Sequence, residues 1–236
     1  MKARSLLSTN LFQSVLIGII FGTLLGCSVN QVEELVVYKN TYEEFSPLNQ
    51  FNIDNTFTIY HRTQESYFDF NGSRNFGRFE TGGFTQVIEG LKDHQYVKIE
   101  FDFFVHDKWE GNGEPGVGED VLIFNIDNSS IHFSSIINTK CLDRNCEAVQ
   151  SFPATIGLQS NPENAGVFDP TLPGVCHFKD EIGGSKQIKI SKLFPHVSEE
   201  LRVTIASGIK NAGPDLCLKS WSVDNLKIST INLAKR

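Results

Sequence analysis

The chain has 236 residues, 40% of them hydrophobic, and a formal net charge of −7 from 21 basic and 28 acidic residues. This acidic balance argues against nucleic-acid binding, because affinity for phosphates needs a basic face. The length suits one large all-β domain or two small ones. Since no Pro/Ser-rich linker or block of charge divides the chain, we expect a single domain.

The first 26 residues have the pattern of an export signal. Lys2 and Arg4 precede an uncharged and mostly apolar run from Leu11 to Leu25. The run ends in Leu24-Leu25-Gly26-Cys27, which resembles the bacterial lipobox, where the cysteine is lipidated and becomes the mature N-terminus. We therefore predict a lipoprotein signal peptide over residues 1–26.

Lipidation of Cys27 would anchor the chain to a membrane, because several acyl chains together give stable binding. Residue 28 is Ser rather than Asp, which in lipoproteins of diderm bacteria implies the outer membrane or cell surface. Residues 27–54 would form a tether or a first strand. The alternatives are an uncleaved membrane anchor, although the run is shorter than the roughly 20 residues needed, and a plain secreted protein, which leaves Cys27 unexplained.

Most of the remaining chain predicts β-strands. Between Gln95 and His106 every second residue is apolar, and charged residues occupy the other face, as in a half-buried antiparallel strand. Further apolar runs or alternations lie at Thr56–Tyr60, Tyr67–Phe70, Phe84–Ile88, Val121–Ile126, Ile131–Ile137, Gln187–Leu193 and Leu201–Ala206. Turn-type clusters such as Asn71-Gly72-Ser73 separate them. We predict an all-β fold, a jelly-roll β-sandwich of two antiparallel sheets over residues 55–230, with a tail at 231–236.

The last predicted strand, Lys219–Ser229, changes its alternation midway. Trp221 and Val223 share one parity, whereas Leu226 and Ile228 share the other. In a regular strand one of these pairs would leave the core, so we expect a bulge or kink at Asp224-Asn225. The alternative is an ordinary strand end with the two pairs packed on opposite sides.

Four cysteines remain when Cys27 is assigned to lipid. An even number in an exported chain indicates two disulfides, and four cysteines allow three pairings. We favour Cys141–Cys146, which closes a small loop, and Cys176–Cys217, which ties a long loop to the penultimate strand region. The alternative of a metal–thiolate site is weak, because the chain has no Cys-x-x-Cys pair.

Five short motifs follow one another in an order found in a group of bacterial extracellular modules. They are Phe76–Phe79, Asp107–Gly113, Gly118–Asp120, Gln150–Pro153 and Ser220–Asn225. Together they make residues 65–230 resemble galactose-binding-domain-like β-sandwiches, which are similar to carbohydrate-binding modules. The chain departs from the group at Glu110, where Asp is usual, and in its cysteine-bearing insert.

Oxygen-bearing side chains gather in the Gly-rich segment between residues 107 and 120. Calcium takes six to eight oxygen ligands, and Asp107, Glu110, Asn112, Glu119 and Asp120 place five such side chains close together in sequence. We therefore expect a structural calcium ion that pins this loop; the resemblance implies that Asp224 and Asn225 complete the site. The alternative is a solvated acidic loop whose carboxylates accept backbone N–H groups.

These features favour a binding module over an enzyme. The six histidines are scattered, with no H-E-x-x-H or G-x-S-x-G motif. Two carboxylates at the distance that a glycosidase needs could occur by chance on any acidic surface, so the acidic residues do not indicate an enzyme. We expect a membrane-anchored module that binds extracellular carbohydrate, with Trp109 stacking on a sugar face. Trp109 as a core residue under its loop is the competing interpretation. The alternative functions are a structural or adhesive lipoprotein that binds a protein partner and, less favoured, a glycoside hydrolase.

Overall fold

The computed structural model describes residues 32–43, 55–60, 67–112, 119–127, 130–138, 149–210 and 216–233, without the side chains of 55–60, 130 and 131. The predicted signal peptide, Cys27, the Cys141–Cys146 pair and residues 234–236 lie outside the described residues. The chain divides into two units, Met1–Glu33 with Leu233–Arg236, and Glu34–Asn232. The second unit holds the apolar core.

The described secondary structure consists of strands, with no helix in those ranges. The strands are β1 (Val32–Asn40), β2 (Asn55–Tyr60), β3 (Tyr67–Phe70), β4 (Ser73–Phe79), β5 (Gly82–Ile88), β6 (Tyr96–Asp107), β7 (Val121–Ile126), β8 (Ser130–Ser135), β9 (Val149–Gln150), β10 (Asn161–Pro162), β11 (Asp169–Pro173), β12 (Ile182–Pro195), β13 (Leu201–Gly208) and β14 (Lys219–Leu233). The all-β prediction is thus confirmed. Within the same ranges no helix is long and apolar enough to span a bilayer.

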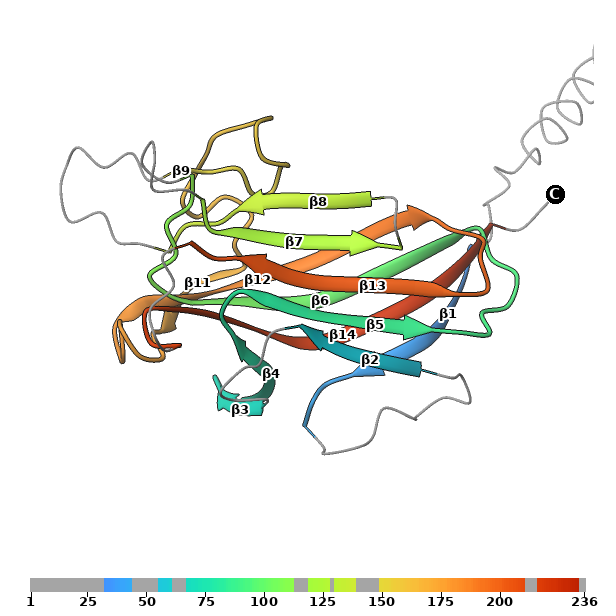
Figure 1. Ribbon diagram of the computed structural model, residues 1–236, viewed down its shortest axis with the longest axis horizontal. Helices are drawn as coiled ribbons and strands as arrows, with labels where there is room; N and C mark the ends of the chain where they lie inside the picture. The colour runs from blue at the N-terminus through green and yellow to red at the C-terminus, as the bar shows by residue number, and fades with distance from the viewer. Residues whose placement is uncertain are drawn as a thin grey trace, which may run out of the picture. The chain divides into compact units, whose positions relative to one another are not determined.

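The strands form two large sheets and one small one (Figure 1). The seven-stranded sheet has the order β11-β12-β6-β14-β4-β3, with β1 also paired to β14, and the five-stranded sheet has the order β2-β5-β13-β7-β8. Strands β9 and β10 pair separately. The pairs that join neighbours in both orders are antiparallel.

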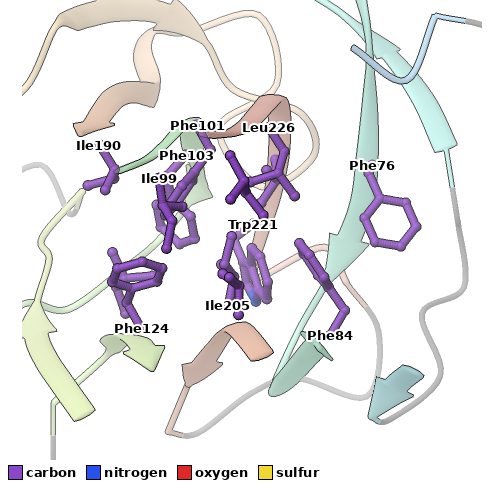
Figure 2. Close-up of a cluster of buried hydrophobic side chains, with 14 of the residues drawn as sticks. Phe76, Phe84, Ile99, Phe101, Phe103, Phe124, Ile190, Ile205, Trp221 and Leu226 are labelled. Carbon is purple, nitrogen blue, oxygen red and sulfur yellow. The ribbon is translucent and has the colours of Figure 1, made fainter. Parts of the chain in front are cut away.

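A single large apolar cluster lies where the two sheets face each other, an arrangement consistent with a β-sandwich. Figure 2 shows Phe84, Phe124 and Ile205 from the five-stranded sheet pointing toward residues of the other sheet. The ring centroids of Phe101 and Phe124, on β6 and β7, are 5.6 Å apart. Burial of these large rings is a main source of the fold's stability.

Two patterns predicted from the sequence are confirmed in the strands. The inward residues of β6, from Val97 to Val105, are at most 2% exposed. On β14 the register shifts between Asp224 and Lys227, and residues on both sides of the shift, such as Val223 and Leu226, have no exposed surface. The bulge therefore lets the apolar residues before and after it point into the core, as expected.

The outer face of β6 is more buried than a half-buried strand would be. Phe68 and Phe70 of β3 contact the rings of Phe104 and His106, although β3 is three places from β6 in the sheet order. The seven-stranded sheet must therefore curl, so that its edge covers its own outer face. Burial lowers the pKa of His106 to about 3, and serine hydroxyls contact both of its ring nitrogens.

Candidate functional site

The loop that follows β6 is held close to the segment that follows β8. The backbone N–H of Glu110 donates to the Asp120 carboxylate at 2.7 Å, and that of Gly111 donates to the carbonyl of Ile136 at 3.0 Å. Gly111 has φ +28°, and a Cβ added there would lie 2.4 Å from the carbonyl oxygen of Val149. Only glycine fits this approach, which is why the loop can lie against its neighbours.

A buried ammonium group lies beneath this loop. Nζ of Lys219, on β14, is 2.8 Å from Glu110 Oε2, 2.9 Å from Asp120 Oδ2 and 3.0 Å from the carbonyl oxygen of Lys210. The Lys219 side chain is 2% exposed and that of Asp120 is 1% exposed. Desolvation raises the pKa of Glu110, but hydrogen bonds from Lys219 and Lys108 outweigh it, and the pKa lies below its ordinary value. All three N–H donors of the ammonium are thus satisfied.

The Asp107 carboxylate, on β6, binds backbone amides of the segment that contains Cys176 and Phe178. Asp107 and Lys219 are cross-strand partners on β6 and β14. The Asp107 carboxylate accepts the N–H groups of Cys176 and Phe178 at 2.9–3.2 Å. Burial raises the pKa of this carboxyl, while these amide bonds act in the opposite direction. The predicted disulfide Cys176–Cys217 is confirmed and fixes the same turn next to the start of β14.

Two further predicted ligands, Asn112 and Glu119, line a groove outside the Lys219 cluster. The Asn112 amide oxygen accepts the hydroxyl of Ser135, and its Nδ2 lies 3.4 Å from the hydroxyl of Ser160. The groove has a volume of about 330 Å³. The described residues that line it are Asn112, Glu119 and the run Ile156–Ser160.

Asp224 and Asn225 lie at a different place on the seven-stranded sheet. Asp224 is level with Asp102 in the strand register, whereas Lys219 is level with Asp107. The Ser73 hydroxyl contacts Asp224 at 2.6 Å, and the Asn225 amide donates to Asp102 at 2.8 Å. Burial raises the pKa of Asp224, the Ser73 hydroxyl opposes this, and the charge of Asp102 adds to it.

The seven oxygen-bearing residues predicted to bind calcium are therefore divided among separate places. In the part of the chain that the structure describes, no group of three or more His, Cys, Asp or Glu side chains is arranged to hold a metal ion. A calcium ion between Glu110 and Asp120 would have to displace the Lys219 ammonium, because each carboxylate already contacts it within 3 Å. The calcium site stays a prediction.

Trp109 lies in the core rather than on a surface. Its side chain has no exposed area, and its indole N–H donates to the carbonyl of Ser220 at 2.9 Å. Its ring meets that of Phe103 edge-on. This placement corresponds to the competing interpretation of a residue packed under its loop, and it leaves no ring face for a sugar.

Sequence reasoning missed Lys219, Ser135 and the Ile156–Ser160 segment. A signal for Lys219 was available, because it has the parity of Trp221 and Val223 on β14 and so must point inward. A lysine on an inward parity needs buried acceptors. For the groove segment, the sequence carries no comparable signal.

No protein-family model matches the chain, and no curated protein is significantly similar to it. The resemblance to galactose-binding-domain-like modules therefore stays a prediction. The case for a function rests on the geometry of the described residues.

Proposed function

We propose that this chain is a lipid-tethered extracytoplasmic binding module, with a jelly-roll topology, that takes carbohydrate in the groove lined by Asn112, Glu119 and the Ile156–Ser160 segment. The observation that carries the proposal is this groove, with its amide, hydroxyl and carboxylate groups beside aliphatic ones. The tether is the lipid that Cys27 would carry.

The strand order supports the jelly-roll assignment. Strands β4, β14, β6 and β12 are neighbours in one sheet, and β5, β13, β7 and β8 are neighbours in the other. Along these eight strands the chain crosses between the sheets at every step except the step from β7 to β8. Eight strands in two interleaved four-stranded sets are what a double Greek key requires.

The chemistry of the groove suits a polyhydroxylated ligand. Sugars present hydroxyl groups, which pair with amide and carboxylate side chains, next to C–H surfaces, which pack on aliphatic groups. Gln159 and Glu119 supply the first kind of contact, and Leu158, which is 75% exposed, supplies the second. Among the described residues that line the groove none is aromatic, so we expect recognition through polar groups and Leu158 rather than ring stacking.

The position of Asn112 supports a preformed groove. Its amide oxygen is occupied by the Ser135 hydroxyl, whose own oxygen accepts the backbone N–H of Ser151 at 2.7 Å. The backbone N–H of Asn112 donates to the carbonyl of Val149 at 3.0 Å. A side chain held in this way loses little freedom when a ligand binds.

The disulfide and the predicted lipid anchor support an extracytoplasmic location. Disulfides persist mainly in oxidising compartments, and Cys176–Cys217 joins residues 41 apart in sequence. If Cys27 is the anchor, Cys27→Ala should abolish incorporation of labelled palmitate and release the protein from the membrane fraction. Retention of both in the variant would contradict the tether.

A glycan array probed with the detergent-solubilised full-length chain tests the ligand class. For any glycan that binds, Gln159→Ala should weaken binding by about 2–10-fold, the equivalent of one hydrogen bond. Leu158→Ala should also weaken it, whereas Leu193→Ala, which removes an exposed leucine on β12 outside the groove lining, should not.

Two outcomes would contradict the proposal. Silence on every glycan would favour the alternative of a protein-binding surface lipoprotein. Equal losses in Leu158→Ala and Leu193→Ala would show that the ligand does not bind in this groove.

A further inference from the structure

Lys219 and Asp120 form a buried pair that joins the two large sheets. Lys219 begins β14 of the seven-stranded sheet, and Asp120 directly precedes β7 of the five-stranded sheet, 99 residues away in sequence. Nζ of Lys219 lies 2.9 Å from Oδ2 of Asp120, and the two side chains are 2% and 1% exposed. An amine and a carboxyl group are thus held together away from bulk water.

This contact places the amine next to a carbon that it can attack. The carboxyl carbon Cγ of Asp120 is one bond beyond Oδ2, so Nζ of Lys219 lies close to the roughly 3–3.5 Å at which reacting atoms are held before a bond forms. Strand pairing with Asp107 fixes the main chain of Lys219. Because both groups are held in place, the effective concentration of the amine at this carbon far exceeds any concentration in solution.

Two backbone amides hold the Asp120 carboxylate. The N–H of Lys210 donates to Oδ1 at 3.0 Å, and the N–H of Glu110 donates to Oδ2 at 2.7 Å. When an amine adds to a carboxyl carbon, negative charge gathers on an oxygen, and fixed N–H donors at about 2.7–3.1 Å stabilise it. The Lys210 amide is therefore placed to stabilise this charge on Oδ1, which leaves Oδ2 as the oxygen that departs.

The Glu110 carboxylate is placed to move protons between the two partners. Its Oε2 lies 2.8 Å from Nζ of Lys219, and its Oε1 contacts Nζ of Lys108 at 3.1 Å, which orients the group. Desolvation raises the pKa of Glu110, but the hydrogen bonds from both lysines outweigh it, so the carboxyl is ionised at neutral pH. It can therefore accept a proton from the Lys219 ammonium.

We propose that an amide bond joins Nζ of Lys219 to Cγ of Asp120 in the folded protein, formed by the chain itself with Glu110 as proton carrier. The N–C bond forms and the bond between Cγ and Oδ2 breaks. Of the three ammonium protons, one stays on the amide nitrogen and two leave with Oδ2 as water, passed on by the Glu110 carboxylate, which ends unchanged. The two charges cancel, and no further reactant is needed.

Burial favours the amide over the ion pair. Two charges kept out of water are costly, whereas an amide is neutral and its oxygen can keep the hydrogen bond from the Lys210 N–H. Lys227 and Glu100 are 3.1 Å apart, but their side chains are 32% and 29% exposed, so water stabilises their charges. The charge-dependent stability of Lys219 and Glu110 belongs to the chain before this reaction.

The bond ties the two large sheets to each other covalently. It joins residues 99 apart in sequence, and Cys217 of the disulfide lies two residues before Lys219. A cross-link between distant residues removes much of the entropy of the unfolded chain. Unlike the disulfide, an amide is not opened by reducing agents, so the sheets stay joined in a reducing medium.

Peptide mass mapping of the full-length chain, unfolded and reduced before digestion with trypsin, tests the bond. We expect one branched product that carries both Lys219 and Asp120, lighter by one water molecule than the two peptides together. Trypsin should not cleave after Lys219, because an acylated lysine carries no charge. Cleavage after Lys219 together with an unmodified Asp120 peptide, as the main species, would overturn the proposal.

Lys219→Arg and Glu110→Gln separate the reaction from folding. Arginine keeps the positive charge but does not lose its proton, so the branched product should be absent while circular dichroism shows a folded protein. Glu110→Gln keeps both partners but removes the proton carrier, so the branched product should form at least about 100-fold more slowly after dilution from urea. An unchanged rate would overturn the proposal. The wild-type map decides even if both variants fail to fold.

Lys227 is the matched control within the same digest. It lies on the same strand and contacts Glu100 at a similar distance, but both side chains are partly exposed. Trypsin should therefore cleave after Lys227 as usual. A branched product at Lys227 as well would show that condensation occurs during handling rather than at a buried site, and would overturn the proposal.

Discussion

Lys219 and Lys227 lie on the same strand, β14, and each contacts two carboxylates, yet their surroundings differ. Lys219 joins Glu110 and Asp120 with its side chain 2% exposed. Lys227 joins Glu34 and Glu100 with its side chain 32% exposed. The distances, from 2.8 to 3.1 Å, are nearly the same in the two clusters.

Burial, and not distance, therefore decides how much each of these two clusters contributes to stability. Around Lys227, water solvates each charge and salt screens the pair, so the contacts contribute little. Around Lys219, the carboxylate of Asp120 has no access to water and depends on the ammonium and on backbone amides. Removing one partner there leaves an uncompensated buried charge.

Lys219→Met should therefore have the largest effect. We expect the free energy of unfolding to fall by about 3–5 kcal/mol, because Asp120 loses its cation while still buried, whereas Glu110 keeps its contact with Lys108. Urea denaturation followed by circular dichroism measures this change. Lys227→Met is the control on the same strand, and equal losses in the two variants would contradict the distinction.

The substitutions Glu110→Gln and Glu100→Gln should have an intermediate effect on the free energy of unfolding, and this effect should depend on pH. The pKa of each carboxyl is lowered despite desolvation, so its contribution is present above the unfolded value of 4.5 and is lost as the pH falls through the folded-state pKa. We expect Glu110→Gln to cost roughly 1–2 kcal/mol at neutral pH, and Glu100→Gln less, because its partner Lys227 is 32% exposed whereas Lys219 is 2% exposed.

In both Gln variants the difference from the wild type should shrink below pH 4.5. Denaturation curves recorded across this range measure it. A cost that stays constant with pH would mean that the lost contribution is packing rather than charge.

Lys227→Met should have the smallest effect. We expect a loss of at most about 1 kcal/mol at low ionic strength, falling toward zero in about 1 M salt, where screening acts over about 3 Å. The loss in Lys219→Met should change little with salt. A salt-independent cost for Lys227→Met would show that its aliphatic stem, rather than its charge, stabilises β1 against β14.

Local pattern predicted much of the fold. The alternation in β6 and the parity change in β14 each depend on a few consecutive residues, because the side chains of a strand alternate between two faces. β3 and β7 begin and end at the predicted residues, and Asn71-Gly72 forms the predicted turn. β4 and β11 were not predicted: Gly77 interrupts the first, and two prolines lie in the second.

The candidate site could not be predicted in the same way, because its contacts join distant parts of the chain. Glu110 and Asp120 are ten residues apart, and this closeness in sequence led to the predicted calcium site. The ammonium that contacts both carboxylates comes from Lys219, which lies 99 residues beyond Asp120. Only strand pairing decides which of many acidic residues meets which cation.

The all-β class, the position of most strands and the bulge in β14 could be predicted from the sequence, whereas the Cys176–Cys217 pairing was one of three that the sequence allowed. These depend on local alternation and on a small number of cysteines. Only the three-dimensional arrangement shows that the predicted calcium ligands lie at separate places, that Trp109 is buried and that the Lys219 ammonium contacts both Glu110 and Asp120. The physical reason is that charge pairing and burial depend on distances in space, which the curl and register of the sheets set.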